Sequence, residues 1–434
     1  MEIKRAEIMP GLWLTHLQSD KFKTACISVS LLTQLSRDTA SMNALIPFVL
    51  RRGTKKYQDM EAISSRLDEL YGAAIEPVVR RIGEIQCVGF YASIPEEDYL
   101  PAGENVLQGS AELMAQLLLE PVMKKGKLLK EYVDSEREKL LELIRSRINE
   151  KRGYALFRCI EEMCCFEDFA VSRYGSESDC ENINFEELSE QYNTLLSSSP
   201  VELFYCGKAD FKKVKTILKD ALKNIPRGEI DYDIGTDVRM NSVEAEPRYV
   251  EEELSVTQGK LVMGFRLGEC MDDPDLAALY VFNAVYGSGT TSKLFMNVRE
   301  KLSLCYYAGS LLDTHKGLMF VSSGIEFDKF DAAKAEILAQ LDEVRAGKVS
   351  DDELNSAKAG IASDLRSMSD VQGDLEGFYL ANTIDGLDCS PEELAAMVEQ
   401  VSLEEVQAVA KSIELDLIYF LTGSDEEDDE DDDC

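Results

Sequence analysis

The sequence ACISVSLLT at residues 25–33 and the sequence KLVMGFRLG at residues 260–268 each have the pattern of a β-strand packed on a sheet. Both runs are rich in apolar residues that favour buried strands. Each is followed by the same order of elements: an apolar helix, a glycine break, a second helix, two strands and a long helix. Matching the two strands, and separately matching Gly83 with Gly317, gives offsets that differ by one residue. A shared order at a nearly constant offset indicates two copies of one α/β unit.

Each copy ends in helices and a closing strand, so the chain divides into two similar halves. The closing helix of the first half has an N-cap residue at Asn184, and the closing helices of the second half have N-cap residues at Ser390 and Ser402. The segment between the halves carries polar and turn residues without a sustained period. The expected divisions are a first half at residues 1–225, a linker at 226–250, a second half at 251–423 and a disordered acidic tail at 424–434.

The chain is long, acidic and poor in histidine. It has 434 residues, a formal net charge of −35, two histidines and 11 scattered cysteines. Such a negative field repels nucleic-acid phosphates and anionic lipid headgroups, so we expect neither nucleic acid nor a membrane surface as a partner. No apolar stretch approaches the roughly 20 residues of a bilayer span, and the start lacks the apolar region of a secretory signal. Together with an odd number of cysteines, this predicts a cytoplasmic, reducing location.

The most specific pattern in the chain is YGSGTTSKLFMNVREKLSLCYYAGS at residues 286–310. It resembles the LxxxVREKxxLxYxxxS stretch of the pitrilysin/insulinase (inverzincin) metallopeptidases and their processing-peptidase relatives. Further matches are NALIPFVLRRGT at residues 43–54, SRYGSESDCENINFEELSEQY at 172–192 and VELFYCGKADFKKV at 201–214. The resemblance implies an α+β fold in which two homologous halves, each a mainly antiparallel sheet covered by helices, form a clamshell around a cavity. The run DELYGA is most similar to the YfmF-like subfamily, which is linked to modification of translation factor EF-P.

The family's zinc motif, HxxEH, is degenerate in this chain. In that motif two histidines one helical turn apart hold the metal, and the glutamate between them activates a water molecule. The resemblance aligns the histidine positions with Ala44 and Phe48 and the glutamate position with Pro47, which we also expect to interrupt the helix. The third ligand position aligns with Leu143, or with Glu142 after a shift of one residue. We therefore expect no metal and no cofactor in this chain.

The second half keeps the family pattern much better. Arg299 and Tyr306 align with the Arg and Tyr that, in this family, reach the substrate carbonyl and the developing oxyanion. If this segment is a strand, the adjacent Tyr307 points to the opposite face. Some relatives divide the work between two chains, one with HxxEH and the other with the Arg/Tyr pair. An alternative is that Arg299 pairs with a nearby carboxylate and that Tyr306 is an ordinary strand aromatic.

Other motifs are weaker. The cysteines Cys159, Cys164 and Cys165 have no second pair or nearby histidine to complete a metal site. The run GSGTTSK at residues 287–293 lacks the ending of a phosphate-binding loop, so we interpret it as a turn. The charged run at residues 130–152 is interpreted as one helix with a solvated face.

These observations favour a noncatalytic subunit of a heterodimeric zinc metallopeptidase. We expect that this chain is not an enzyme by itself. Its expected partner is a homologous HxxEH-containing subunit that brings the zinc, and the expected substrate is a peptide or a protein. The alternative is a pseudopeptidase scaffold or substrate-holding protein without a proteolytic role, linked to EF-P modification. A homodimer of the isolated chain is left open, as are the substrate and the resting state of the cavity.

Overall fold

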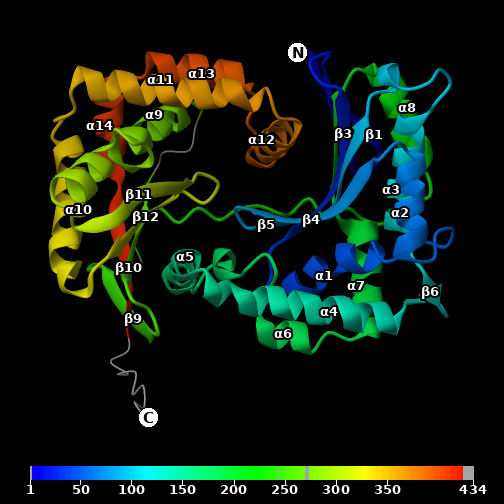
Figure 1. The fold of residues 1–434 in the computed structure, drawn as a ribbon, viewed down its shortest axis with the longest axis horizontal. Coiled ribbons are helices and arrows are strands. Elements are labelled where there is room, and N and C mark those ends of the chain that lie inside the picture. The colour runs from blue at the N-terminus through cyan, green and yellow to red at the C-terminus, as the bar shows by residue number, and fades with distance from the viewer. Residues whose placement is uncertain (1, 243, 269–272, 424–434) are drawn as a thin grey trace, which may run out of the picture. The chain divides into compact units, whose positions relative to one another are not determined.

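A computed structural model of the protein describes residues 2–242, 244–268 and 273–423. The expected tail, Cys270 and Cys434 lie outside the described residues. The chain forms two compact units, each with its own sheet (Figure 1). Unit 1 consists of Met1–Ser146, Val171–Thr236 and Met368–Asp388, and unit 2 consists of Arg147–Ala170, Asp237–Ser367 and Cys389–Cys434.

Unit 1 is built on a six-stranded sheet. Its strands, in spatial order, are β1 (Glu2–Met9), β2 (Leu12–Gln18), β8 (Val201–Gly207), β3 (Thr24–Gln34), β5 (Ile85–Pro95) and β4 (Ala74–Ile82). Neighbours pair antiparallel except β2 and β8, which are parallel. The strand expected at residues 25–33 is the central part of β3, and its apolar residues are buried.

Helices cover one face of this sheet and form the main core of unit 1. They are α1 (Ala40–Leu50), α2 (Met60–Glu69), α3 (Val106–Leu119), α4 (Lys130–Arg145), α6 (Glu177–Glu181), α7 (Phe185–Ser198) and α8 (Phe211–Leu222). Leu203 and Tyr205 of β8 point into this core, and the alternate residues Phe204 and Cys206 point to the other face. The expected cap at Asn184 is confirmed, because its side chain accepts hydrogen bonds from the first turn of α7.

The sheet of unit 2 has the same strand arrangement as the sheet of unit 1, except that it has no counterpart of β1. Its strands, in spatial order, are β11 (Cys305–Asp313), β12 (Leu318–Ile325), β10 (Gly259–Arg266), β13 (Glu414–Gly423) and β9 (Arg248–Leu254). Only β13 and β9 are parallel, as β8 and β2 are in unit 1. Gly83 and Gly317 both lie in the hairpin turn between the corresponding strands, with φ of 55° and 68°. The predicted α+β fold of two similar halves with mainly antiparallel sheets is therefore confirmed.

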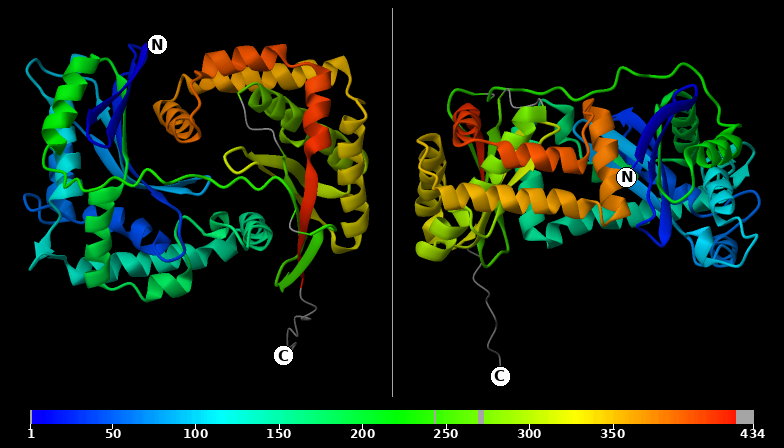
Figure 2. Two further views of the ribbon diagram at one scale, coloured as in Figure 1. Left: turned by 180° about the vertical axis from the view of Figure 1, so that it is seen from behind. Right: turned by 90° about the horizontal axis from the view of Figure 1, so that it is seen from above.

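Helices lie on both faces of the second sheet (Figures 1 and 2). They are α5 (Lys151–Met163), α9 (Asp273–Asn283), α10 (Phe330–Arg345), α11 (Asp351–Met368), α13 (Pro391–Gln400) and α14 (Leu403–Ser412). Ser390 and Ser402 each form a complete capping box, as their spacing predicts. Two segments after α9 are π-helical, η4 (Ala284–Ser288) and η5 (Leu294–Lys301). The sequence predicted an ordinary helix for η5, and a π-helix at such a position is typical of functional sites.

Two helices belong to different units from their neighbours in sequence. Helix α5 follows α4 in the first half of the chain but belongs to unit 2, whereas α12 (Gln372–Asp385) follows α11 in the second half but belongs to unit 1. The compact units are therefore not the contiguous halves that the sequence suggests. The charged run expected as one helix is divided into α4 and α5 by a short 3₁₀ turn, Ser146–Asn149. Apolar periodicity shows that a helix has a buried face, but not which sheet that face covers.

A carboxylate ties α5 to the second sheet. Glu252 of β9 accepts hydrogen bonds from the Tyr154 hydroxyl at 2.6 Å, the Tyr419 hydroxyl at 2.8 Å and Arg158 Nε at 3.0 Å. Burial acts to raise the pKa of Glu252, but these hydrogen bonds outweigh it and hold the pKa below its ordinary value. The apolar side of α5 adds contacts of Cys159 and other residues with β10, β12 and β13.

A buried group of charges reinforces the same attachment. The guanidinium of Arg266 is fully buried, 2.7 Å from Glu167 in the segment after α5 and 2.9 Å from Asp416 of β13. Lys316 also reaches Glu167, at 2.7 Å. Removing one member of such a group leaves an uncompensated buried charge, which typically costs about 3–5 kcal/mol.

Polar contacts also hold α12 on the sheet of unit 1. Gln372 Nε2 donates to the carbonyls of Thr24 and Cys206, both at 2.9 Å, and so joins β3 to β8. Arg80 of β4 forms an ion pair with the buried Glu376. Leu375 of α12 packs against Cys206 of β8 and the apolar residues around it. The face of this sheet opposite the main core is thus covered by α12, a helix from the second half of the sequence.

No helix in the described part of the chain is long and apolar enough to cross a membrane. The nine described cysteines are free thiols, of which Cys165 alone is exposed. Residues 226–242, in the expected linker, contain no helix or strand, and β9 begins at Arg248 inside the expected linker range.

Candidate functional site

The residues at the zinc-motif positions belong to the core of unit 1. Ala44 and Pro47 are buried in α1, and Phe48 packs against the same core. None of these side chains has an atom that binds zinc. The prediction that Pro47 interrupts the helix is wrong, because α1 continues to Leu50 and Arg51 N–H donates to the carbonyl of Pro47. Burial on nearly every side holds this helix together where propensity alone would not.

The third ligand position also lacks a metal-binding arrangement. Leu143 and Glu142 are both exposed on α4. Among the described residues, no group of three or more His, Cys, Asp or Glu side chains could hold a metal ion. His16 serves the fold instead, with Nε2 2.9 Å from the carbonyl of Ala209 and its ring stacked on Tyr205. Burial lowers the pKa of His16 and so favours the neutral ring.

Arg299 projects from η5 on the surface of unit 2. Its guanidinium lies 4.6 Å from the ring centre of Phe295, and its Nε is 3.6 Å from the carboxylate of the adjacent Glu300. Its side chain is 42% exposed, so neither contact removes it from solvent. Two loose contacts of this kind leave the guanidinium available to a ligand.

Tyr306 lies next to this helix, at the start of β11. The pairing of β11 with β12 shifts by one residue between Cys305 and Tyr307, so Tyr306 is the extra residue of a β-bulge. It is 65% exposed, whereas Tyr307 lies against the sheet with Arg152 4.3 Å above its ring. The two adjacent tyrosines therefore differ in exposure, and the bulge interrupts the regular alternation that the sequence predicted for them.

The structure brings the segments of Arg299 and Tyr306 side by side. Strand β11 packs along η5. Burial raises the pKa of Cys305, the residue that precedes Tyr306, and the positive charge of Arg299 acts in the opposite direction. Neither side chain is needed for the core of unit 2, because both are exposed.

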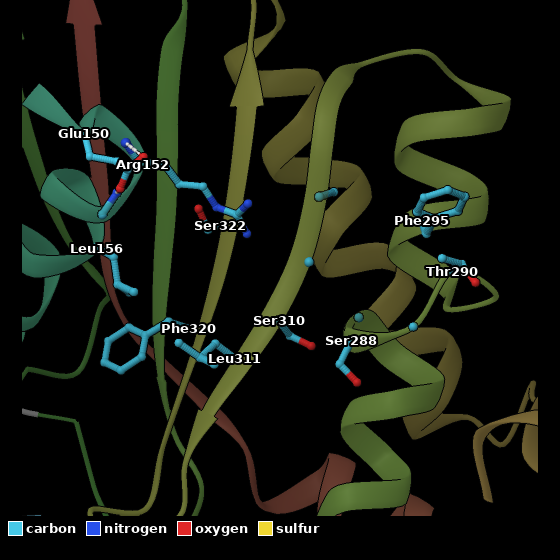
Figure 3. A pocket seen from close by; sticks show the side chains of 15 residues that line it. Glu150, Arg152, Leu156, Ser288, Thr290, Phe295, Ser310, Leu311, Phe320 and Ser322 are labelled. Carbon is cyan, nitrogen blue, oxygen red and sulfur yellow. Dashed lines mark hydrogen bonds between the residues drawn. The ribbon is translucent and has the colours of Figure 1, made fainter. Parts of the chain in front are cut away.

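A cavity of about 410 Å³ lies within unit 2, beside the same strand (Figure 3). Its walls are the start of α5, the strands β11 and β12, and the turn that follows η4. The lining residues are Glu150, Arg152, Gly153, Leu156, Gly287, Ser288, Gly289, Thr290, Phe295, Ala308, Gly309, Ser310, Leu311, Phe320 and Ser322. The volume falls in the roughly 300–1,000 Å³ range of ligand pockets.

Glycines bring the end of η4 close to β11. A Cβ atom on Gly287 would lie 2.4 Å from Ser310 Oγ, and one on Gly309 would lie 3.2 Å from the carbonyl of Gly287. The run at 287–293, interpreted as a turn from the sequence, begins in the last two residues of η4 and continues as a turn, and its first residues form one wall of the cavity. The cavity was not predicted from the sequence, although Gly287, Gly289 and Gly309 were a signal for close backbone approach.

Arg152 and Ser322 are the polar groups at one end of the cavity. Figure 3 shows them on the α5 side of β11, with Leu156, Phe320 and Leu311 nearby. Sequence reasoning placed Arg152 on a solvated helix face. It lines a cavity because the helix to which it belongs packs on the second sheet.

Comparison with known proteins agrees with these observations. Residues 182–361 match a protein family described as "Peptidase M16 inactive domain". The chain is 31% identical over 417 residues to the "Probable inactive metalloprotease YmfF" of Bacillus subtilis, and the match covers 96% of each chain. The chain belongs to the M16 metallopeptidase family. Together with the apolar residues at the zinc positions, these matches identify it as an inactive member of that family.

Solved structures of similar proteins share its fold. A conserved protein from Enterococcus faecalis V583 has a TM-score of 0.88 at 27% identity, covering 98% of this chain and all of the other. A peptidase M16 inactive domain from Pseudomonas fluorescens has a TM-score of 0.79 at 15% identity, covering 98% of this chain and 99% of the other. The pitrilysin/insulinase-type family expected from the residues at 286–310, which is the M16 family, is thus confirmed by the sequence match over 96% of the chain, and the fold is shared with these structures.

Proposed function

We propose that this M16 chain is the noncatalytic subunit of a heterodimeric zinc metallopeptidase located in the cytoplasm. Its partner is a homologous chain with an intact HxxEH motif, and this chain contributes Arg299 and Tyr306 to the binding of the substrate. The observation that carries the proposal is an asymmetry. Apolar side chains without a donor atom occupy the HxxEH positions, with Ala44 and Pro47 buried in the core, whereas Arg299 and Tyr306 are exposed and have no core role.

The residues of this chain do not fit a zinc ion. Ala44 and Phe48 have no donor atom, and Leu143 cannot replace a carboxylate. No chemical step is therefore assigned to a metal here, and the zinc belongs to the partner. A guanidinium and a phenol hydroxyl are donors that stabilise charge on a peptide oxygen when water is excluded.

The edge of the second sheet supports the peptide-binding part of this proposal. Strand β11 is the last strand of its sheet, so no other described strand pairs with its outer edge, although η4 and η5 pack next to this strand. Tyr306 and Leu311 are both exposed along it, at 65% and 55%. An extended peptide that pairs with such an edge gains main-chain hydrogen bonds, while nearby pockets select its side chains.

The test uses the complex of this chain with an HxxEH-containing M16 chain from the same cells. The complex should contain zinc and cleave peptides, and Arg299→Ala and Tyr306→Phe should each lower kcat/KM by about 10²–10³-fold, the usual effect of losing an oxyanion donor. The matched control is Lys301→Ala, which removes an exposed positive charge from the same π-helix. If both variants cleave as fast as the control, the proposed contribution of Arg299 and Tyr306 to catalysis is refuted.

A scaffold that holds a protein segment without cleavage is the second candidate. The cavity in unit 2 favours it, because this binding space exists without the zinc positions. In this case affinity purification from the native cells would recover a bound protein but no HxxEH chain and no zinc. Recovery of EF-P or its modifying enzymes would support the link that the YfmF-like resemblance suggests.

A further inference from the structure

The cavity in unit 2 contains donors that lack acceptors. The guanidinium of Arg152 has five N–H groups. None of them donates a hydrogen bond to a described residue, and the guanidinium forms no ion pair with one. Its only described side-chain contact is with the ring of Tyr307, 4.3 Å below the guanidinium. The guanidinium is therefore held in place by stacking while its hydrogen-bonding groups stay free.

The second polar group at this end of the cavity is the hydroxyl of Ser322. Ser322 is 9% exposed, lines the cavity, and its buried Oγ makes no hydrogen bond of good geometry to a described residue. The buried hydroxyl of Tyr307 is in the same situation beside it. Burial raises the pKa of Tyr307, and a side-chain hydrogen bond with the Ser322 hydroxyl acts in the opposite direction, so the two hydroxyls face each other. When one of these hydroxyls donates to the other, one O–H of the pair is still left without an acceptor, and a buried donor without an acceptor is costly, so the pair indicates a missing acceptor.

The carboxylate of Glu150 does not supply that acceptor. One oxygen accepts from the backbone N–H of Arg152 at 3.2 Å, and the other accepts from the backbone N–H of Gly153. Glu150 thus caps α5 and adds a negative charge at the rim of the cavity. A dianionic phosphate would be repelled by this charge and by the net charge of −35, whereas a single carboxylate balances the one guanidinium.

The other walls suit a peptide chain. Leu156, Phe320 and Leu311 form an apolar surface beside Arg152 (Figure 3). On the other side of β11, Ser288 and Thr290 offer polar groups near the turn. An apolar side chain fits the first surface while the backbone follows the edge of β11.

We propose that Arg152 and Ser322 bind a carboxylate of an extended peptide that lies along β11. The carboxylate is either the C-terminal group of the peptide or an acidic side chain. Tyr307 acts as a positioning residue, because its ring supports the guanidinium. This inference rests on the peptide-holding part of the proposed function and adds the class of ligand that the cavity selects.

The test is a binding assay on the isolated full chain with three labelled hexapeptides of alanine and leucine. The first has a free C-terminal carboxylate, the second a C-terminal amide, and the third a C-terminal amide and one internal glutamate. The free acid should bind on the order of 10- to 100-fold more tightly than the plain amide, as expected for a hydrogen-bonded charge. Binding of the third peptide at the level of the first would identify an acidic side chain as a ligand, and weak binding would identify the C-terminus.

Variants separate the site from the general charge of the protein. Arg152→Gln and Ser322→Ala should each reduce the preference for the carboxylate. The matched control, Arg147→Gln, removes another arginine stacked on an aromatic ring, 3.9 Å from Phe157, that does not line the cavity. Equal thermal stability of the variants shows that they fold, and Arg152 is exposed, so its replacement leaves the core intact.

Three results would overturn the inference: equal affinity for acid and amide, a preference that survives Arg152→Gln, or no saturable binding of the free acid at millimolar concentration. The assay contains neither a partner nor zinc, so its outcome is independent of cleavage. A carboxylate preference with no effect of Arg299→Ala on cleavage would refute the assistance to catalysis and leave this site in place.

Discussion

Glu202 makes the stability of unit 1 depend on pH near neutrality. Its carboxylate lies in β8 with a side chain that is 10% exposed, and burial raises its pKa from 4.5 to about 7. Arg5 is 2.7 Å away, but its side chain is 37% exposed, so solvent screens its charge and burial dominates. Between these two pKa values the folded chain holds a proton that the unfolded chain has released.

The sign and size follow from proton linkage. Stability falls with rising pH wherever the folded state binds more protons, so the contribution of Glu202 is fully present below pH 4.5 and is lost as the pH passes 7. Between pH 5 and pH 8 the expected loss is about 2 to 3 kcal/mol, taking 1.36 kcal/mol per pKa unit. Glu202→Gln removes this dependence because an amide does not titrate in that range.

The assay is urea unfolding at pH 5 and at pH 8, followed by tryptophan fluorescence. The chain has a single tryptophan, Trp13 in β2, which pairs directly with Glu202 and so reports on this region. The free energy of unfolding of the wild type, relative to Glu202→Gln, should drop by the stated amount between the two pH values. The control, Glu112→Gln on the exposed side of α3, should change in parallel with the wild type. If the difference in the free energy of unfolding between the wild type and Glu202→Gln is the same at both pH values, the proposal that Glu202 is buried and protonated is refuted.

Three further predictions concern the two exchanged helices and a cap. Glu252→Gln weakens hydrogen bonds from Tyr154, Tyr419 and Arg158, so it should destabilise unit 2 by roughly 2–3 kcal/mol and increase amide hydrogen exchange in β13. Leu375→Ala should cost about 2–5 kcal/mol and expose Cys206 under α12 to thiol reagents, and unchanged thiol reactivity would contradict the packing of α12. Ser390→Ala should lower stability by about 1 kcal/mol in thermal unfolding, through loss of the capping box of α13.

Local sequence patterns were sufficient to predict most of the helices and strands. The alternating run at residues 25–33 and the apolar run at 260–268 are the strands β3 and β10, and Gly83 and Gly317 lie in matching hairpin turns. These predictions succeeded because strand burial, turn geometry and helix caps depend on residues a few positions apart. The loss of the zinc motif could also be predicted, because it depends only on which residues occupy aligned positions.

Other features depend on contacts between distant residues. Pro47 stays inside α1 because burial of the helix outweighs the loss of one hydrogen bond. The bulge at Tyr306 arises from the pairing of β11 with β12, which no single strand specifies. The π-helical turns at Arg299 have no distinct composition, so the sequence predicted an ordinary helix there.

The sequence by itself determined the duplicated α+β architecture, the M16 resemblance and the absence of metal ligands at the zinc positions. Tertiary structure decided which sheet each helix covers, and so placed α5 in unit 2 and α12 in unit 1. That exchange turns Arg152 from an apparent surface residue into a wall of the cavity beside Ser322. The physical reason is that an amphipathic pattern encodes the presence of an apolar face, whereas its partner is selected by complementary packing and buried polar contacts such as that of Glu252 with α5.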